Sequence, residues 1–231
     1  MKPVGPIPPG YSALDGELAI AGRLASALVA EAGGTPLFVY DRALLDARVA
    51  QLRAALPGRV GINYAVKANP LPAVVAHMAG LVDGFDIASA GELAICQRLG
   101  IDPARISFAG PGKRDDELTA AIEAGVTLNC ESAGEAARAL AIGARLGKPP
   151  RIAIKPFGVD ADKVPALARH VIAAGAEWRG LHIFTGSQTL SADAIIEAQG
   201  KVLDLAATLA EAIGHPLPKL NMGGGFGIPY F

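Results

Sequence analysis

The chain has 231 residues, of which 51% are hydrophobic and 19% charged, and its formal net charge is −1. This length suits one large domain or two small ones, and the apolar share argues against a disordered chain. The balanced charge argues against a polyanion binder, because nucleic-acid binding needs surplus positive charge.

The cysteines and the N-terminal stretch indicate in which cellular compartment the protein is expected. Cys96 and Cys130 form neither a CxxC pair nor a metal-ligand cluster, so we expect no disulfide framework, no metal site and a reducing, cytoplasmic compartment. No apolar run approaches the roughly 20 residues that cross a bilayer, and the start is unlike a secretory signal. We therefore expect neither a membrane nor a nucleic acid as a partner.

Short apolar runs bounded by glycine or polar residues predict strands along the chain. They are 37–40, 60–66, 84–88, 106–109, 126–129, 151–154, 181–185 and 220–222. Several are apolar throughout, as in strands that are covered on both faces. Apolar residues spaced by three and four predict helices over 45–56, with Asp41 as N-cap, and over 202–213.

A strand–cap–helix unit occurs twice in the sequence. The tetrad SAGE stands at 89–92 and again at 132–135, each time directly after a predicted strand and before a helical stretch. Both tetrads fit a capping box, and both helices can stop at a glycine. Repeated βα units need parallel strands, so the seven strands after residue 60 predict a (β/α)8 barrel, with an open doubly wound sheet as the alternative.

Two features indicate that the barrel is incomplete in this chain. The sequence ends over 223–231, just past the seventh of these strands, without an eighth strand. The strand 151–154 also runs directly into KPFG at 155–158, which is a very tight connection. We expect an N-terminal segment over 1–34 and a barrel domain over 35–231 that lacks its last strand.

Polar and glycine residues recur where the predicted strands end, which is where βα barrels carry their chemistry. Lys67 ends a strand, where a buried amine would stay neutral and could form an imine; a solvated lysine is the alternative. Gly186-Ser187 and Gly223–Gly225 follow the last two strands. Their backbone N–H groups could hold a phosphate, or the glycines could simply serve a turn.

The segment YAVKANP at 64–70 resembles the pyridoxal-phosphate lysine motif of the ornithine/diaminopimelate/arginine decarboxylase family. These are fold-type III enzymes with a barrel similar to that of alanine racemase. The similarity continues in the same order through FDIASAGE (85–92), GPGK (110–113), NCES (129–132), and the stretches 182–188 and 221–227. It therefore covers nearly the whole chain from residue 35 onward.

The resemblance implies a pyridoxal 5'-phosphate cofactor that Lys67 holds through a Schiff base. The other cofactor-binding positions that it implies are Asp86, Glu92, Arg151, Phe184, Ser187, Gly223, Gly224 and Gly225. Asp86 and Glu92 would lie near the lysine and Arg151 beside the cofactor, while Ser187 and the three glycines would hold the phosphate. Phe184 stands where the family has a ring-stacking histidine, and it can stack but cannot donate a hydrogen bond. This departure points to a divergent subgroup, such as the decarboxylases associated with exosortase systems.

The resemblance further implies a lyase that decarboxylates an amino acid, with a diamino acid such as diaminopimelate, ornithine or lysine as substrate. It implies a homodimer that completes the site across its interface. The C-terminal β-domain of the family and its late glutamate segment have no counterpart in the sequence. An amino-acid racemase on the same barrel and a non-catalytic pyridoxal-phosphate-binding protein are the alternatives.

Overall fold

The computed structural model describes residue 7 and residues 10–228. Their contacts divide them into two compact units, one containing the residues up to Gly61 and one beginning at Ile62. Residues 37–40 and the helix that follows them belong to the first unit. The domain boundary after residue 34 stays a prediction. The ends of both predicted domains, at 1–6, 8–9 and 229–231, lie outside the described residues.

The first unit holds a three-stranded antiparallel sheet and two helices. The sheet has the order β1 (Ser12–Leu14), β2 (Glu17–Ile20), β3 (Arg23–Leu24), and the helices are α1 (Ala25–Ala32) and α2 (Arg42–Ala55). Asp41 caps α2 as predicted, since its carboxylate accepts the Ala43 N–H at 2.8 Å. The strand predicted at 37–40 was wrong: this run pairs with no strand, and Phe38 is largely exposed.

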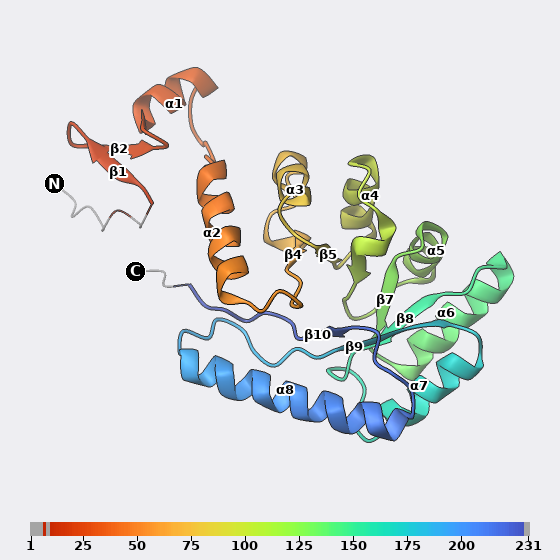
Figure 1. The fold of residues 1–231 in the computed structure, drawn as a ribbon. Coiled ribbons are helices and arrows are strands. Elements are labelled where there is room, and N and C mark those ends of the chain that lie inside the picture. Colours follow the sequence, from red (N-terminus) through yellow and green to blue (C-terminus); the bar gives the residue numbers. More distant parts are fainter. Residues whose placement is uncertain (1–6, 8–9, 229–231) are drawn as a thin grey trace. The chain divides into compact units, whose positions relative to one another are not determined.

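The second unit is built on a seven-stranded sheet in which every neighbouring pair is parallel (Figure 1). In chain order the strands are β4 (Asn63–Ala65), β5 (Gly84–Ile87), β6 (Ile106–Phe108), β7 (Thr127–Cys130), β8 (Arg151–Ile154), β9 (Glu177–His182) and β10 (Leu220–Asn221). Each strand pairs with its neighbours in the chain, from β4 at one edge to β10 at the other. This unbroken order confirms the barrel topology over the doubly wound alternative, in which the order reverses at a switch point.

Helices connect these strands and lie on the outer side of the curled sheet (Figure 1). They are α3 (Pro72–Ala79), α4 (Ala90–Arg98), α5 (Asp115–Ala124), α6 (Ala133–Leu146), α7 (Val164–Ala173) and α8 (Ala192–Ile213), with 3-10 turns η1 (Val66–Ala68) and η2 (Pro103–Arg105). Buried apolar side chains from strands and helices fill the space between the two layers. Among them are Phe85, Phe108, Leu118, Ile152, Val171 and Leu209.

The two SAGE tetrads cap α4 and α6 in the same way. The Ser89 hydroxyl accepts the Glu92 N–H at 3.2 Å, and the Ser132 hydroxyl accepts the Glu135 N–H at 3.0 Å. These bonds satisfy N–H groups that would otherwise lack a partner in the first helical turn. Glycines with positive φ follow both helices, as predicted; they are Gly100 (+67°) and Gly147 (+62°).

The strand predicted at 181–185 is β9, which begins four residues earlier and ends at His182. Charged residues in its first half hid this part from a search for apolar runs. In the structure Glu177 pairs with Arg179 of the same strand at 2.8 Å and with Arg151 of β8 at 3.2 Å. The other predicted strands of this unit agree with the observed ones to within three residues at each end.

Candidate functional site

Lys67 lies in the η1 turn directly after β4. The register pairs Ala65 of β4 with Asp86 of β5, so Lys67 stands two residues beyond that pair at the carboxyl edge of the sheet. The residue is exposed, which corrects the expectation of a buried, desolvated amine. The physical reason is that β4 is an edge strand with a neighbouring strand on one side only. Its motif and its position, rather than burial, therefore distinguish Lys67.

Asp86 connects the two edges of the sheet. Its carboxylate accepts hydrogen bonds from Asn221 of β10 at 3.2 and 3.3 Å and from Asn63 of β4 at 3.5 Å. The sheet must curl strongly for β10 to reach a residue of β5. Glu92 acts locally, because its carboxylate accepts the Ala88 N–H at 2.8 Å and so shapes the turn after β5.

The loops after β9 and β10 pack directly against each other. A Cβ on Gly225 would lie 2.3 Å from the Gly186 oxygen, and one on Gly223 would lie 2.9 Å from the Phe184 ring. Gly223 and Gly225 also have φ angles of +69° and +94°, which other residues rarely adopt. The Thr189 N–H donates to the Gly225 oxygen at 2.9 Å and ties the loops together. The two glycine loops therefore lie in direct contact.

Between the contacts at Gly223 and Gly225, the loops leave open space at Gly224. No atom lies within 4 Å of the place where a side chain on Gly224 would begin. Ser187 on the facing loop is exposed. The two loops thus touch at Gly223 and Gly225, where a Cβ would clash with the facing loop, and leave open space at Gly224. We call this pair of loops, Gly186-Ser187 and Gly223–Gly225, the backbone cradle.

The carboxyl end of β9 carries a buried histidine and a phenylalanine. His182 is only 7% exposed, and its Nδ1 is buried without a hydrogen-bond partner among the described residues. Burial lowers the pKa of this imidazole, and the nearby Asp86 carboxylate opposes that effect. Two residues on, the ring of Phe184 meets the ring of Phe157 edge-on, with centroids 6.3 Å apart. A polar atom that the protein itself leaves unused therefore lies close in the chain to an aromatic pair.

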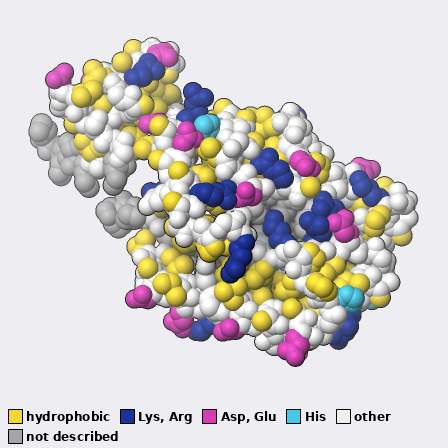
Figure 2. Space-filling model, in the orientation of Figure 1, with side chains coloured by type: hydrophobic (Ala, Val, Ile, Leu, Met, Phe, Trp, Pro, Cys, Tyr) yellow, Lys and Arg dark blue, Asp and Glu magenta, His cyan; other side chains and the backbone are white. Residues whose placement is uncertain are grey.

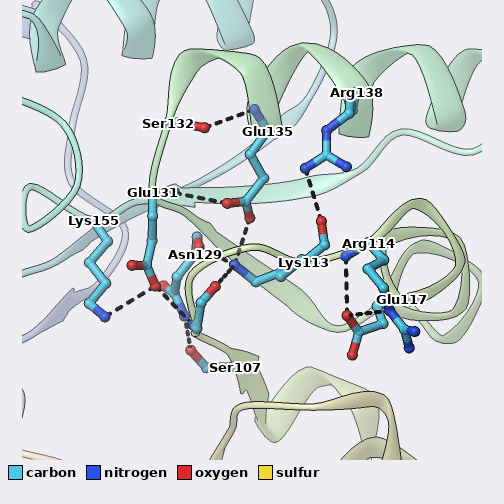
Figure 3. Close-up of polar contacts among 11 residues, drawn as sticks. Ser107, Lys113, Arg114, Glu117, Asn129, Glu131, Ser132, Glu135, Arg138 and Lys155 are labelled. Atoms are coloured by element: carbon cyan, nitrogen blue, oxygen red, sulfur yellow. Dashed lines mark hydrogen bonds and ion pairs between the residues drawn. The ribbon is translucent and has the colours of Figure 1, made fainter.

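A buried ion pair lies at the carboxyl ends of β6 and β7 (Figure 3). Lys113 is 3% exposed and donates to Glu135 at 2.6 Å. Its amine also donates to the Gly110 and Asn129 oxygens at 2.9 and 2.8 Å. All three donors of the amine are thus used inside the protein. The segment Gly110–Lys113 therefore has a structural role at the rim.

A second pair continues this network across β8. Glu131 accepts the Gly110 N–H at 2.8 Å and the Lys155 amine at 3.1 Å (Figure 3). Lys155 also lies 5.5 Å from the centre of the Phe157 ring. Lys155 was not among the residues predicted for the site. The signal was present, since Lys155 directly follows the buried strand β8, at the same carboxyl edge of the sheet as Lys67.

Arg151 does not lie where the resemblance implies. It is the first residue of β8, at the amino edge of the sheet, whereas the glycine loops and Lys67 follow the carboxyl ends. Its guanidinium donates to the Gly125 oxygen at 2.7 Å and pairs with Glu177 at 3.2 Å. These contacts hold it at the amino edge, which corrects its expected place beside the cofactor.

The amino side of the sheet has a cavity of about 20 Å³, which holds roughly one water molecule. It is lined by residues of β6 to β10 and their approaches, including Arg105, Ser107, Asn129, Arg179, Lys219 and Asn221. Figure 2 shows Lys and Arg side chains around the hollowed middle of the face in view. A cavity of this size is too small for a cofactor. The candidate site is the carboxyl edge, because it carries Lys67 and the glycine loops.

Neither a metal-ion cluster nor a membrane-spanning helix occurs among residue 7 and residues 10–228. No three His, Cys, Asp or Glu side chains there come close enough together to hold a metal ion. No helix in that part of the chain is both long and apolar enough to cross a bilayer.

Comparison with known families gives one match. The sequence model described as "Pyridoxal-dependent decarboxylase, pyridoxal binding domain" matches residues 42–142 and 153–231. The diaminopimelate decarboxylase of Aquifex aeolicus is 36% identical over 94% of this chain and 56% of its own length. An L-glutamyl-[BtrI acyl-carrier protein] decarboxylase of Niallia circulans is 31% identical over 85% of this chain and 51% of its own length.

Solved structures of similar fold include an Aquifex aeolicus protein with a TM-score of 0.87 and 38% identity, over 96% of this chain and 57% of that one. A diaminopimelate decarboxylase from M. jannaschii in complex with L-lysine has a TM-score of 0.84 and 26% identity, over 96% of this chain and 58% of that one. The chain thus spans a little over half the length of the relatives that it matches.

Proposed function

Because the chain belongs to the pyridoxal-dependent decarboxylases through their pyridoxal-binding domain, we propose that it binds pyridoxal 5'-phosphate and serves amino-acid decarboxylation. The proposed substrate class is a diamino acid. The diaminopimelate decarboxylases among its relatives support this class, as does the L-lysine bound in one of the similar structures. The assignment to an exosortase-associated subgroup stays a prediction.

The observation that best supports this proposal is the backbone cradle, in which Gly223–Gly225 lies against Gly186-Ser187. A phosphate fits such a cradle because glycines let backbone N–H groups approach its oxygens, and Ser187 adds a hydroxyl. The unused Nδ1 of His182 and the ring of Phe184 extend from the same strand end. These features fit a planar, phosphorylated heterocycle.

When bound, pyridoxal phosphate supplies an electron sink that takes up the electron pair left by departing carbon dioxide. We assign the chain's own residues the following work. Lys67 supplies the amine that attaches to the aldehyde carbon, from the strand next to Asp86. Ser187 and the triple glycine hold the phosphate, and Phe184 offers an apolar face to the ring. Held in this way, a substrate bond can be oriented for cleavage.

The attachment point can be tested by adding pyridoxal phosphate to the purified chain, reducing with borohydride and mapping the labelled peptide by mass spectrometry. We expect the label on Lys67. In Lys67→Ala, we expect both the label and the visible absorbance of the bound cofactor to be lost. Lys219→Ala is the matched control, because Lys219 is an exposed lysine at the amino side of the sheet. Labelling that persists in Lys67→Ala would refute the assignment.

The reaction is tested by supplying lysine, ornithine, arginine and diaminopimelate in both chiral forms and measuring carbon dioxide and α-carbon inversion separately. Carbon dioxide release supports the proposal. Inversion without release identifies a racemase. Binding without turnover identifies a non-catalytic carrier, the alternative that rests on Phe184 in place of the family's histidine.

We also propose a cytoplasmic homodimer that shares the site across its interface. The compartment is supported by Cys96 and Cys130, which are both free and buried. The dimer rests on the resemblance to the family. Light scattering of the chain with pyridoxal phosphate should give twice the monomer mass, and a monomer at all concentrations would contradict the dimer.

A further inference from the structure

Asn221 makes hydrogen bonds to two separate parts of the site. Its Nδ2 donates to both oxygens of Asp86, at 3.2 and 3.3 Å, and its Oδ1 accepts the Gly223 N–H at 2.9 Å. Asn221 is the last residue of β10, and Gly223 opens the triple-glycine loop. One side-chain amide thus links the loop to the carboxylate.

The contact with Asp86 is not a consequence of strand pairing. The sheet order places β9, β8, β7 and β6 between β10 and β5, so the bond crosses the interior of the curled sheet. Asp86 in turn pairs through the backbone with Ala65, two residues before Lys67. The amide of Asn221 therefore joins the edge that carries the glycine loop to the edge that carries the lysine.

A side-chain amide suits both partners at once. Asp86, when ionised, offers acceptors only, and the Gly223 N–H is a donor, so the residue between them must donate on one side and accept on the other. Turning the amide over would set oxygen against carboxylate and NH₂ against N–H. The two partners therefore fix the amide in one orientation.

We propose that Asn221 is a positioning residue that sets the phosphate loop relative to the aspartate beside Lys67. This inference rests on the proposed binding of pyridoxal phosphate. It predicts that Asn221 matters for the phosphate group in particular, because the bond to Gly223 acts on the loop assigned to the phosphate.

The test compares the affinity for pyridoxal phosphate with that for pyridoxal, which lacks the phosphate. In Asn221→Ala we expect the ratio of the two affinities to fall about tenfold, as for the loss of one well-placed hydrogen bond to a charged site. Asn129→Ala is the control, because the Asn129 amide donates to Ser107 and contacts neither Asp86 nor the loop. That variant should keep the ratio.

A swap provides the decisive second variant. Asn221→Asp alone sets two carboxylates face to face and should lower the ratio. Asp86→Asn/Asn221→Asp exchanges amide and carboxylate, keeps an acceptor for Gly223, and should restore the ratio to within about threefold of the wild type. Because both ligands contain the pyridine ring, the ratio of their affinities cancels effects of a variant on ring binding alone. Circular dichroism shows whether each variant folds.

The outcomes separate the two claims. A wild-type chain that captures no pyridoxal phosphate refutes the proposed function, and the inference falls with it. A wild-type chain that binds, with an unchanged ratio in Asn221→Ala or no restoration by the swap, overturns the inference alone. Should Asn221→Ala fail to fold, the swap decides by itself.

Discussion

Lys67 and Arg151 show what a motif leaves open about a single side chain. The motif around Lys67 identifies its chemistry, but its exposure depends on β4 being an edge strand. Arg151 matched a family position in sequence, yet Glu177 and the Gly125 oxygen hold it at the opposite edge. Residue type alone therefore predicts candidate chemistry, and neighbouring strands decide whether the side chain reaches the site.

His182 should make stability depend on pH. Burial lowers the pKa of its imidazole, against the opposing effect of Asp86, so the unfolded chain takes up a proton before the folded chain does as the pH falls. Stability from this group is therefore present above about pH 6.5 and is lost below it. We expect the free energy of unfolding to drop more steeply between about pH 7.5 and 5.5 in the wild type than in His182→Gln.

Urea unfolding at each pH measures this difference. His215→Gln is the control, since His215 is exposed, and it should follow the wild type. Parallel pH curves for the wild type and His182→Gln would contradict the prediction.

At the scale of elements, the two SAGE units show how much of a helix N-terminus a local sequence motif predicts. The serine caps agree with the capping box in both helices. The glutamates, however, reach the N–H of the residue before the cap: Glu92 accepts from Ala88, and Glu135 from Glu131 at 3.3 Å. Glu135 uses its other oxygen for Lys113, so the second repeat has become part of the buried network.

Breaking the buried Lys113–Glu135 pair should destabilise the fold strongly. Lys113→Met leaves a carboxylate buried without its partner, which costs about 3–5 kcal/mol. Lys113→Met/Glu135→Leu removes both charges and should recover most of this loss. Urea denaturation gives the free energies of unfolding.

The control for this experiment is Lys201→Ala, which breaks the exposed pair of Lys201 with Glu197. Exposed pairs contribute little, so we expect no measurable change there. A double variant as unstable as Lys113→Met would contradict the account of an uncompensated charge.

At the scale of the whole molecule, the two open edges of the described sheet govern which backbone amides are protected from hydrogen exchange. The described sheet has two edges, β4 and β10, and the interior strands β6 to β8 have a partner on each side. The side-chain bonds of Asp86 with Asn221 and Asn63 connect the edges without backbone pairing between them. The edges should therefore open before the centre does.

Hydrogen exchange followed by mass spectrometry tests this gradient. Amides of β6, β7 and β8 should exchange slowest, and those of β4 and β10 at least about tenfold faster, because edge amides need only local opening. Adding pyridoxal phosphate should slow exchange at the edges more than at the centre. Uniform protection across the sheet would argue against open edges.

The sequence alone determined the repeated strand–cap–helix unit, the parallel barrel order and the lysine and glycine motifs. These follow from apolar runs, caps and turns, which are properties of neighbouring residues. The tertiary structure decided that Lys67 is exposed, that Arg151 faces the amino edge, and that Asn221 bonds Asp86. Each of these depends on the curl of the sheet, which brings together residues far apart in the chain, and no local pattern encodes that distance.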